Sequence, residues 1–268
     1  MNSQEFALSI KRHALEMVMR ANASHIGGSL SMADLIAVLY DGVLRVRPAE
    51  PAWSGRDRFV LSKGHCCSVV YAALAVRGFF PEAELASFGQ DGSRLMTHIT
   101  HKVPGVEFST GSLGHGLSFG AGKALAAKRA RKDWRVFVML SDGELDEGSN
   151  WEAILFAQHH GLDNLTVIID YNKVQSLGRV AEIQQLEPLA DKFRAFRWGV
   201  EEINGHDHHA IRSVLDSLPR IPGKPSCVIA HTVKGKGVGF MEDQLLWHYR
   251  SPNPEQLRTA LGQLEGKP

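Results

Sequence analysis

Five short apolar runs alternate with segments of helical periodicity along the chain. Two of them, "WRVFVML" and "LTVIID", have no polar alternation, which is typical of strands covered on both faces. A shorter strand is expected at 59–61, and two more candidates lie in "RWGVEEI" and "PSCVIAHT". Because strand and helix alternate, the order predicts an α/β fold: a doubly wound, mainly parallel sheet with helices on both faces.

Helical patterns fill the intervals between these runs. Near the N-terminus, apolar residues recur at Phe6, Ile10, Ala14, Met17 and Ala21, which predicts an amphipathic helix rather than a secretory leader. Further helices are expected at 147–160 and in "DHHAIRSVLDSL".

Two other apolar segments also read as helices. In "SLSMADLIAVLYDGVL", Ser31 and Asp34 resemble the N-terminal box of a second helix. The segment 66–76 is the most apolar stretch, but it falls well short of the roughly 20 residues that a bilayer span requires. We therefore interpret it as a buried helix.

Composition narrows the class of protein. The chain has 268 residues, 44% of them hydrophobic and 22% charged, enough for one large domain over 1–268. Lys and Arg number 30 against 29 Asp and Glu, so no overall field favours a nucleic acid or a membrane as partner. Cys66 and Cys67 are adjacent and the total of three is odd, which argues against a disulfide framework and favours a cytoplasmic setting.

Polar residues follow two of the predicted strands. Asp142 and Gly143 come after one apolar run, and Asn172 follows the next. Ligands of open parallel sheets sit beyond the carboxyl ends of the strands, so both loops are expected to face one site. A carboxylate, an amide oxygen and a backbone carbonyl suit Mg²⁺ with a phosphate, and Gly143 would let that phosphate approach the backbone. From these residues alone, a simple turn with a capping Asn is an equally good reading.

A wider pattern of segments carries a resemblance to a known family. The stretch 141–174 resembles the diphosphate and metal motif of thiamine diphosphate enzymes. Four further segments occur in the order found in transketolases: "ASHIGGSLSMADL", "DRFVLSKGHCCSVVYAAL", "MTHITHKVPGVEFSTGSLGHGLSFGAGKALA" and "WHYRSP". The resemblance extends from about residue 10 to about residue 250, with two departures: Ser141 stands where Gly is common and Ser112 where Pro is common.

The resemblance implies a cofactor, thiamine diphosphate, and a metal ion. Asp142, the side-chain oxygen of Asn172 and the main-chain carbonyl of Val174 would hold Mg²⁺, or another divalent cation such as Ca²⁺ or Mn²⁺. Gly143 would contact the diphosphate.

Three more positions follow from the same resemblance. Gly111 and Leu113 would offer main-chain contacts near the cofactor, and Glu147 would belong to a carboxylate network that joins active sites across an interface.

Four of the thirteen histidines match transketolase positions that line the funnel to the thiazolium ring: His25, His65, His98 and His248. A sugar presents several hydroxyls and one carbonyl, and imidazoles can donate or accept protons near pH 7. By the resemblance, His65 and His248 would also lie close to the diphosphate, while His25 and His98 would contact hydroxyls near the reacting carbons. Any one of them alone would be read as an ordinary loop histidine.

The sequence assigns no role in the site to most of the other histidines. We expect solvated surface side chains at His13, His159 and His160, and a polar helical turn rather than a metal site at 206–209. His101 lies close to His98, but the spacing to "PGVE" favours His98. "KGKGVGF" is interpreted as a mobile Gly-rich loop, since it lacks the context of a P-loop.

The resemblance also implies that this chain needs a partner. In transketolases the glutamate that activates the aminopyrimidine ring belongs to a second, pyrimidine-binding domain, and 1–268 is expected to form only the diphosphate-binding domain. The chain therefore resembles the N-terminal subunit of a split transketolase. A separate C-terminal subunit would carry the pyrimidine-binding and C-terminal domains, plausibly in a heterotetramer with two copies of each chain.

The implied reaction is transfer of a two-carbon ketol unit from a ketose or ketose phosphate to an aldose. One alternative is the α subunit of a 2-oxo acid dehydrogenase or a deoxyxylulose phosphate synthase fragment; the four histidines argue against the former. Another is a non-catalytic binding or regulatory protein that keeps the fold. A nicotinamide dehydrogenase is disfavoured because no G-x-G-x-x-G follows an early strand.

Overall fold

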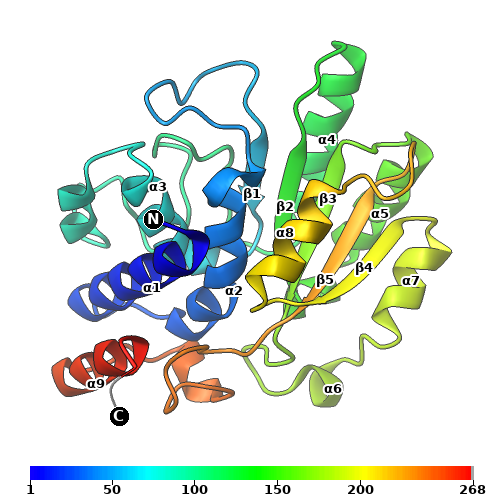
Figure 1. Cartoon of the computed structure of the whole chain (residues 1–268). Helices are drawn as coiled ribbons and strands as arrows, with labels where there is room; N and C mark the ends of the chain where they lie inside the picture. Colours follow the sequence, from blue (N-terminus) through cyan, green and yellow to red (C-terminus); the bar gives the residue numbers. More distant parts are fainter. Residues whose placement is uncertain (267–268) are drawn as a thin grey trace.

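Five parallel strands form the central sheet of the computed structural model, which describes residues 1–266 (Figure 1). The strand order is β1-β2-β3-β5-β4, and every neighbouring pair is parallel. All five predicted strands are present: β1 (Arg58–Leu61), β2 (Val136–Ser141), β3 (Leu165–Tyr171), β4 (Gly199–Asn204) and β5 (Ser226–His231). The predicted parallel α/β class is confirmed.

The register of the sheet places the two polar loops side by side. Ser141 at the end of β2 pairs with Asp170 near the end of β3, and Tyr171 pairs with His231 of β5. Every residue of β2 and β3 is buried, as their unbroken apolar runs predict. Asp142 and Asn172 therefore leave the sheet at the same edge.

Helices cover both faces of the sheet (Figure 1). Phe137 and Met139 of β2 pack into one core with the first helices of the chain, while Val138 and Leu140 face a second core on the other side. The first face carries α1 (Ser3–Arg20), α2 (Ile26–Val38), α3 (Cys67–Val76), α8 (His208–Asp216) and α9 (Pro254–Leu264). The second carries α4 (Gly116–Arg129), α5 (Gly148–His159), the short α6 (Val180–Ile183) and α7 (Leu189–Ala195).

The second helix begins earlier than the sequence predicts. α2 starts at Ile26, after His25 in a left-handed conformation with φ 75°, so Ser31 and Asp34 lie inside the helix and cap nothing. Both side chains are buried and bond to other elements instead: Ser31 donates to Asp170, and Asp34 accepts from Lys11. The capping-box interpretation is wrong because these polar residues make tertiary contacts.

Short helical turns lead into two of the longer elements. A 3₁₀ turn at Gly64–Cys66 precedes α3, and another at Gly143–Asp146 precedes α5, so the helix expected at 147–160 starts one residue late. Two further 3₁₀ turns and one π-helical turn lie at Glu82–Ser87, Leu245–His248 and Leu39–Val43.

One segment within 1–266 is long and apolar enough to cross a membrane by length and composition alone. It covers Ile26–Val43, with a mean hydropathy of 1.3, and 89% of it is buried inside the fold. Burial by its own protein is what a core helix requires.

Candidate active site

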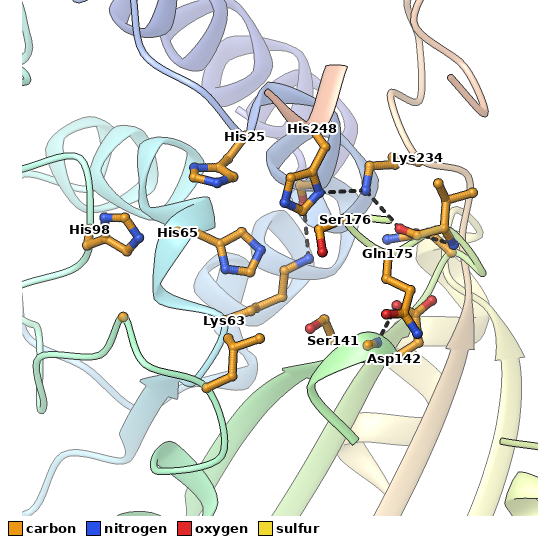
Figure 2. Close-up of a pocket in the computed structure, with 16 residues that line it drawn as sticks. His25, Lys63, His65, His98, Ser141, Asp142, Gln175, Ser176, Lys234 and His248 are labelled. Carbon is orange, nitrogen blue, oxygen red and sulfur yellow. Dashed lines mark hydrogen bonds between the residues drawn. The ribbon is translucent and has the colours of Figure 1, made fainter. Parts of the chain in front are cut away.

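A cleft opens at the carboxyl ends of the strands (Figure 2). Its empty volume is about 770 Å³, open mouth included. The predicted residues that line it come from six separate loops or helix starts: His25, His65, His98, Gly111, Leu113, Asp142, Gly143, Asn172, Val174 and His248. Glu147 does not line it. The structure thus brings the predicted cofactor, metal and histidine positions into one place, while their roles stay predictions.

Asp142 is held rigidly at the floor of the cleft. Its side chain accepts hydrogen bonds from the backbone N–H of Gly143 at 2.7 Å and of Lys173 at 2.5 Å, and the residue is 2% exposed. Burial and the nearby Asp170 carboxylate raise the pKa of Asp142 to about 6. A buried carboxylate of this kind is stabilised by any cation that reaches it.

Asn172 and Val174, together with Asp142, make up the oxygen corner of the cleft. The Asn172 side-chain oxygen accepts from the Val174 N–H at 3.1 Å, and the Val174 carbonyl accepts from Nζ of Lys234 at 2.8 Å. The Lys234 ammonium therefore already donates to one of the three oxygens that are predicted to bind the metal.

This donor set fits a hard divalent cation that brings its own phosphate ligands. Carboxylate, amide and carbonyl oxygens are the ligands that Mg²⁺ prefers. Among residues 1–266, no group of three or more His, Cys, Asp or Glu side chains is arranged to hold a metal ion by itself, so phosphate or water would have to complete the shell. A Cβ on Gly143 would lie 2.8 Å from Cβ of Gln175, and its absence leaves the backbone open at this corner.

The four predicted histidines form one cluster, the histidine wall, on the side of the cleft opposite Asp142 (Figure 2). The His25 ring centroid lies 4.9 Å from that of His65, 5.1 Å from His248 and 5.8 Å from His98. His25 and His248 are also joined through the backbone, since the His25 N–H donates to the His248 carbonyl at 2.9 Å. Residues from opposite ends of the chain therefore build this wall together.

All four imidazoles are held neutral. Burial, followed by the charges of neighbouring histidines and lysines, lowers the pKa of His25 to about 4 and places the pKa of His65 well below its ordinary value. Burial and Lys234 lower the pKa of His248 to about 3, and burial lowers that of His98. A neutral imidazole both donates and accepts, so this wall can bind a hydroxylated molecule without carrying charge.

Two buried lysines in the cleft were missed by the sequence analysis. Lys63 is 1% exposed and pairs with the buried carboxylate of Asp170, which raises the pKa of Lys63 even though burial opposes it. Lys234 is 3% exposed and contacts His248 Nδ1 at 3.1 Å; burial and the charge of Lys63 lower its pKa. The signals for Lys234 were its place just past the apolar run of β5 and at the start of the Gly-rich segment 234–240.

The sequence predicts a mobile Gly-rich loop at 234–240, whereas in the structure this segment is hydrogen-bonded to neighbouring parts of the fold. The Gly235 N–H donates to the Gly27 carbonyl at 2.9 Å, and Asp243 N–H donates to the Lys234 carbonyl at 2.9 Å. The loop is therefore hydrogen-bonded to α2 at the point where it enters the cleft.

Glu144 is another buried acid at the site, and the sequence analysis passed over it in favour of Glu147. It is fully buried and accepts from Ser62 Oγ at 2.5 Å, Gly114 N–H at 3.0 Å and Ser141 N–H at 3.3 Å. Burial raises its pKa, which these three hydrogen bonds oppose. Glu144 thereby fastens the loop of Gly111 and Leu113 to the ends of β1 and β2.

Three further positions singled out in the sequence are Glu147, Ser141 and His101. Glu147 is exposed at the start of α5, a position open to another chain. Ser141 lines the cleft with ordinary backbone angles, so this departure from the family pattern is accommodated. His101 lies outside the cleft lining, as the choice of His98 requires.

Of the other histidines, His159 and His160 are exposed as predicted, whereas His13 is partly buried and faces Glu82. The 206–209 segment does form the polar start of α8, with Asp207 as its cap.

Comparisons with known proteins identify related sequences and structures. Residues 2–259 match the family model described as "Transketolase, thiamine diphosphate binding domain". The chain is 42% identical over 251 residues to an apulose-4-phosphate transketolase subunit of Phocaeicola vulgatus, covering 94% of this chain and 89% of that protein. It is 40% identical over 263 residues to "6-deoxy-6-sulfo-D-fructose transketolase subunit SqwG" of a Clostridium species, covering 98% and 96%.

Solved structures of full-length relatives share the fold. Transketolase from Campylobacter jejuni matches with a TM-score of 0.93 and 33% identity over 99% of this chain, and transketolase from Leishmania mexicana with 0.94 and 30% over 100%. This chain spans 43% and 42% of those two solved chains.

Proposed function

The chain belongs to the transketolase family, as its thiamine diphosphate-binding domain, and we propose that it transfers a two-carbon ketol unit as the N-terminal subunit of a split enzyme. The observation that carries this proposal is that the oxygen corner, which includes Asp142, and the histidine wall face each other in one cleft. One half suits a cation with a diphosphate, and the other suits a polyhydroxylated substrate.

Thiamine diphosphate is the cofactor of this domain, and we propose Mg²⁺ as the accompanying cation. Asp142, the Asn172 side-chain oxygen and the Val174 carbonyl would hold the metal, while Gly143, Gly111 and Leu113 would offer backbone contacts. Lys63 and Lys234 place positive charge in the same cleft as the diphosphate would occupy. When bound, the cofactor supplies the nucleophilic carbon and the electron sink for carbon–carbon cleavage.

The histidines would handle the hydroxyls and the carbonyl of the sugar. Because burial keeps them neutral at pH 7, each ring presents one N–H and one lone pair, and each can move a proton as a ketose is cleaved and an aldose is taken up. His25 and His98 are proposed to contact hydroxyls around the reacting carbons, and His65 and His248 to lie nearer the diphosphate.

A separate C-terminal subunit is implied, because two relatives of similar length are named as subunits and the chain matches only 43% of a full-length transketolase. We propose that this partner contributes the pyrimidine-binding and C-terminal domains, that two copies of each chain assemble, and that the complex works in the cytoplasm. Glu147, exposed at the start of α5, would then lie at a subunit interface.

The donor is proposed to be an anionic ketose. One relative is named for a sugar phosphate and the other for a sulfonated sugar, so both names include an acidic group. This chain supplies the neutral histidine wall, and recognition of the acidic end would fall to the partner.

The proposal is tested by coexpression with the C-terminal subunit, followed by assay of a donor and acceptor panel. Ketose phosphates, sulfonated ketoses and pyruvate are offered as donors, with aldoses as acceptors, and each chain by itself is the control. Ketol transfer that needs both chains, thiamine diphosphate and a divalent cation supports the proposal. Turnover of pyruvate without ketose transfer would point to the 2-oxo acid enzymes, and cofactor binding without any turnover would point to a regulatory protein.

A further inference from the structure

A histidine outside the cleft contacts the backbone that leads into it. His206, in the turn between β4 and α8, places Nδ1 2.7 Å from Oδ2 of the buried Asp34 on α2. Its other ring nitrogen, Nε2, lies 2.9 Å from the backbone nitrogen of Val233. We propose that the Asp34–His206 pair is a positioning device that fixes the peptide before Lys234 and thereby sets the Lys234 ammonium in the cofactor cleft.

The chemistry of these contacts defines one tautomer. A backbone N–H can only donate, so Nε2 of His206 must carry a lone pair to accept from Val233. The ring proton then sits on Nδ1 and is donated to the Asp34 carboxylate. This is the arrangement by which a carboxylate orients an imidazole in many protein sites.

Asp34 is suited to that task because it stays ionised. Burial would raise its pKa, but hydrogen bonds from His206 and His208 and the charge of Lys11 hold that pKa well below its ordinary value. Lys11 Nζ lies 2.9 Å from the other carboxylate oxygen, Oδ1. An anionic acceptor at Oδ2 favours the Nδ1–H tautomer and fixes the plane of the His206 ring.

The fixed peptide leads directly to the site. Lys234 follows Val233, and its Nζ lies 2.8 Å from the Val174 carbonyl and 3.1 Å from His248 Nδ1, contacts drawn in Figure 2. The next residue, Gly235, is tied to the Gly27 carbonyl. The backbone is therefore held on both sides of Lys234, once through Asp34 and once through Gly27, and both anchors belong to α2.

A neighbouring histidine provides a matched control. His208 Nε2 lies 3.4 Å from Oδ1 of the same Asp34, and its Nδ1 lies 2.9 Å from Ser3 Oγ. It shares the burial and the carboxylate of His206 but has no contact with Val233 among the recorded hydrogen bonds of 1–266. If the cluster only stabilised the fold, loss of either histidine would have the same effect on the cleft.

The inference rests on the proposed function, so the experiment has readouts with and without the cofactor. Variants His206→Ala, His206→Gln and His208→Ala are prepared in the complex with the C-terminal subunit. Calorimetry gives the affinity for thiamine diphosphate with Mg²⁺, and amide hydrogen exchange reports the Val233 N–H. Imidazole ¹⁵N spectra of the wild-type chain report which ring nitrogen of His206 carries the proton.

We expect His206→Ala to speed exchange at Val233 and to weaken cofactor binding by about tenfold, in the range found when a residue that orients a ligand is removed. His206→Gln should recover most of both, because its amide oxygen can accept from Val233. His208→Ala should leave both near the wild-type values.

The inference would be overturned if His206→Ala and His208→Ala lost cofactor affinity equally, or if exchange at Val233 were unchanged in His206→Ala. It would also be overturned by a proton on Nε2 of wild-type His206. Failure of the wild-type complex to bind thiamine diphosphate would instead sink the proposed function. The ¹⁵N and exchange results would then still decide whether the Asp34–His206 pair holds Val233.

Discussion

The ammonium of Lys63, which lines the cleft, and the carboxylate of Asp170 form a salt bridge, with the two side chains 1% and 0% exposed. Ser31 and Thr232 also donate to this carboxylate, so α2, β3 and the end of β5 meet there. The pair places two opposite charges in the interior at the point where the cofactor diphosphate would be bound.

Breaking this pair should strongly destabilise the fold. Lys63→Met leaves the Asp170 carboxylate buried without its counter-charge, which typically costs about 3–5 kcal/mol. Chemical denaturation of the isolated chain measures the loss. Lys128→Met is the control, because Lys128 pairs with Asp163 at the surface and such pairs contribute about 1 kcal/mol or less. Similar losses in both variants would contradict the interpretation of Lys63–Asp170.

Removal of the Glu144 side chain should loosen the loop that carries Gly111 and Leu113. Glu144→Ala leaves the Gly114 N–H and the Ser62 hydroxyl without their acceptor, at a cost of about 1–3 kcal/mol for each buried group. Denaturation measures stability, and calorimetry on the complex should show weaker binding of thiamine diphosphate. Glu152→Ala, on the exposed side of α5, should change stability by less than about 0.5 kcal/mol.

Two cleft variants should separate binding from turnover. Asp142→Ala removes the one carboxylate of the oxygen corner and should abolish metal-dependent cofactor binding. His25→Ala should leave binding near normal and slow ketol transfer by about 10²–10⁴-fold, the usual contribution of one acid–base group. Calorimetry and steady-state kinetics on the complex measure these effects, and equal loss of binding in both variants would contradict the assigned roles.

The histidine wall should make the fold sensitive to acid. An unfolded histidine titrates at 6.5, whereas burial lowers the pKa of His25 to about 4 and that of His248 to about 3. Between these values the unfolded chain binds more protons, so stability is complete above about pH 6.5 and is lost as the pH falls toward 4. Melting temperatures from pH 8 to 4 should show this decline.

The same scan on two variants identifies the source of the decline. The melting temperature of His25→Ala should decline less steeply as the pH falls. That of His159→Ala, which alters an exposed side chain, should follow the wild type. An unchanged slope in His25→Ala would count against the neutral wall.

Metal binding should weaken in mild acid. Because burial and Asp170 raise the pKa of Asp142 to about 6, a proton and a cation compete for this carboxylate near neutral pH. The affinity for Mg²⁺ in the presence of thiamine diphosphate should fall by up to about tenfold per pH unit below 6. Asp142→Asn cannot titrate, so it should bind Mg²⁺ weakly and with no such pH dependence. A wild-type affinity for Mg²⁺ that stays constant between pH 5 and 7 would contradict the competition.

The sheet and much of the cleft could be predicted because their signals are local. An unbroken apolar run marks a buried strand, and the parallel order then dictates that Asp142 and Asn172 leave at the same edge. The histidines could be grouped only by resemblance to a family, since nothing in the spacing of His25 and His248 shows that their backbones are hydrogen-bonded.

The features that were missed depend on partners distant in sequence. Lys63, Glu144 and Lys234 look like surface residues to any rule based on composition, because charged side chains are rarely buried unless paired. Their partners, such as Asp170 for Lys63, come from other elements of the fold. The N-terminal box at Ser31 failed for a related reason, since α2 begins at Ile26 and the Ser31 hydroxyl, inside the helix, bonds to Asp170 of β3 and to the Gly28 carbonyl.

The backbone contact between His25 and His248 also bears on the order in which a newly made chain can fold. Ser24 Oγ bonds to the Tyr249 carbonyl and Ser251 Oγ to the Val18 carbonyl, so three consecutive ties join the first α-helical hairpin to the last loop. While a nascent chain is still emerging from the ribosome, all five strands can be complete when this wall still lacks one of its four histidines, His248. The cleft is therefore completed only when residue 248 has emerged, late in the synthesis of the chain.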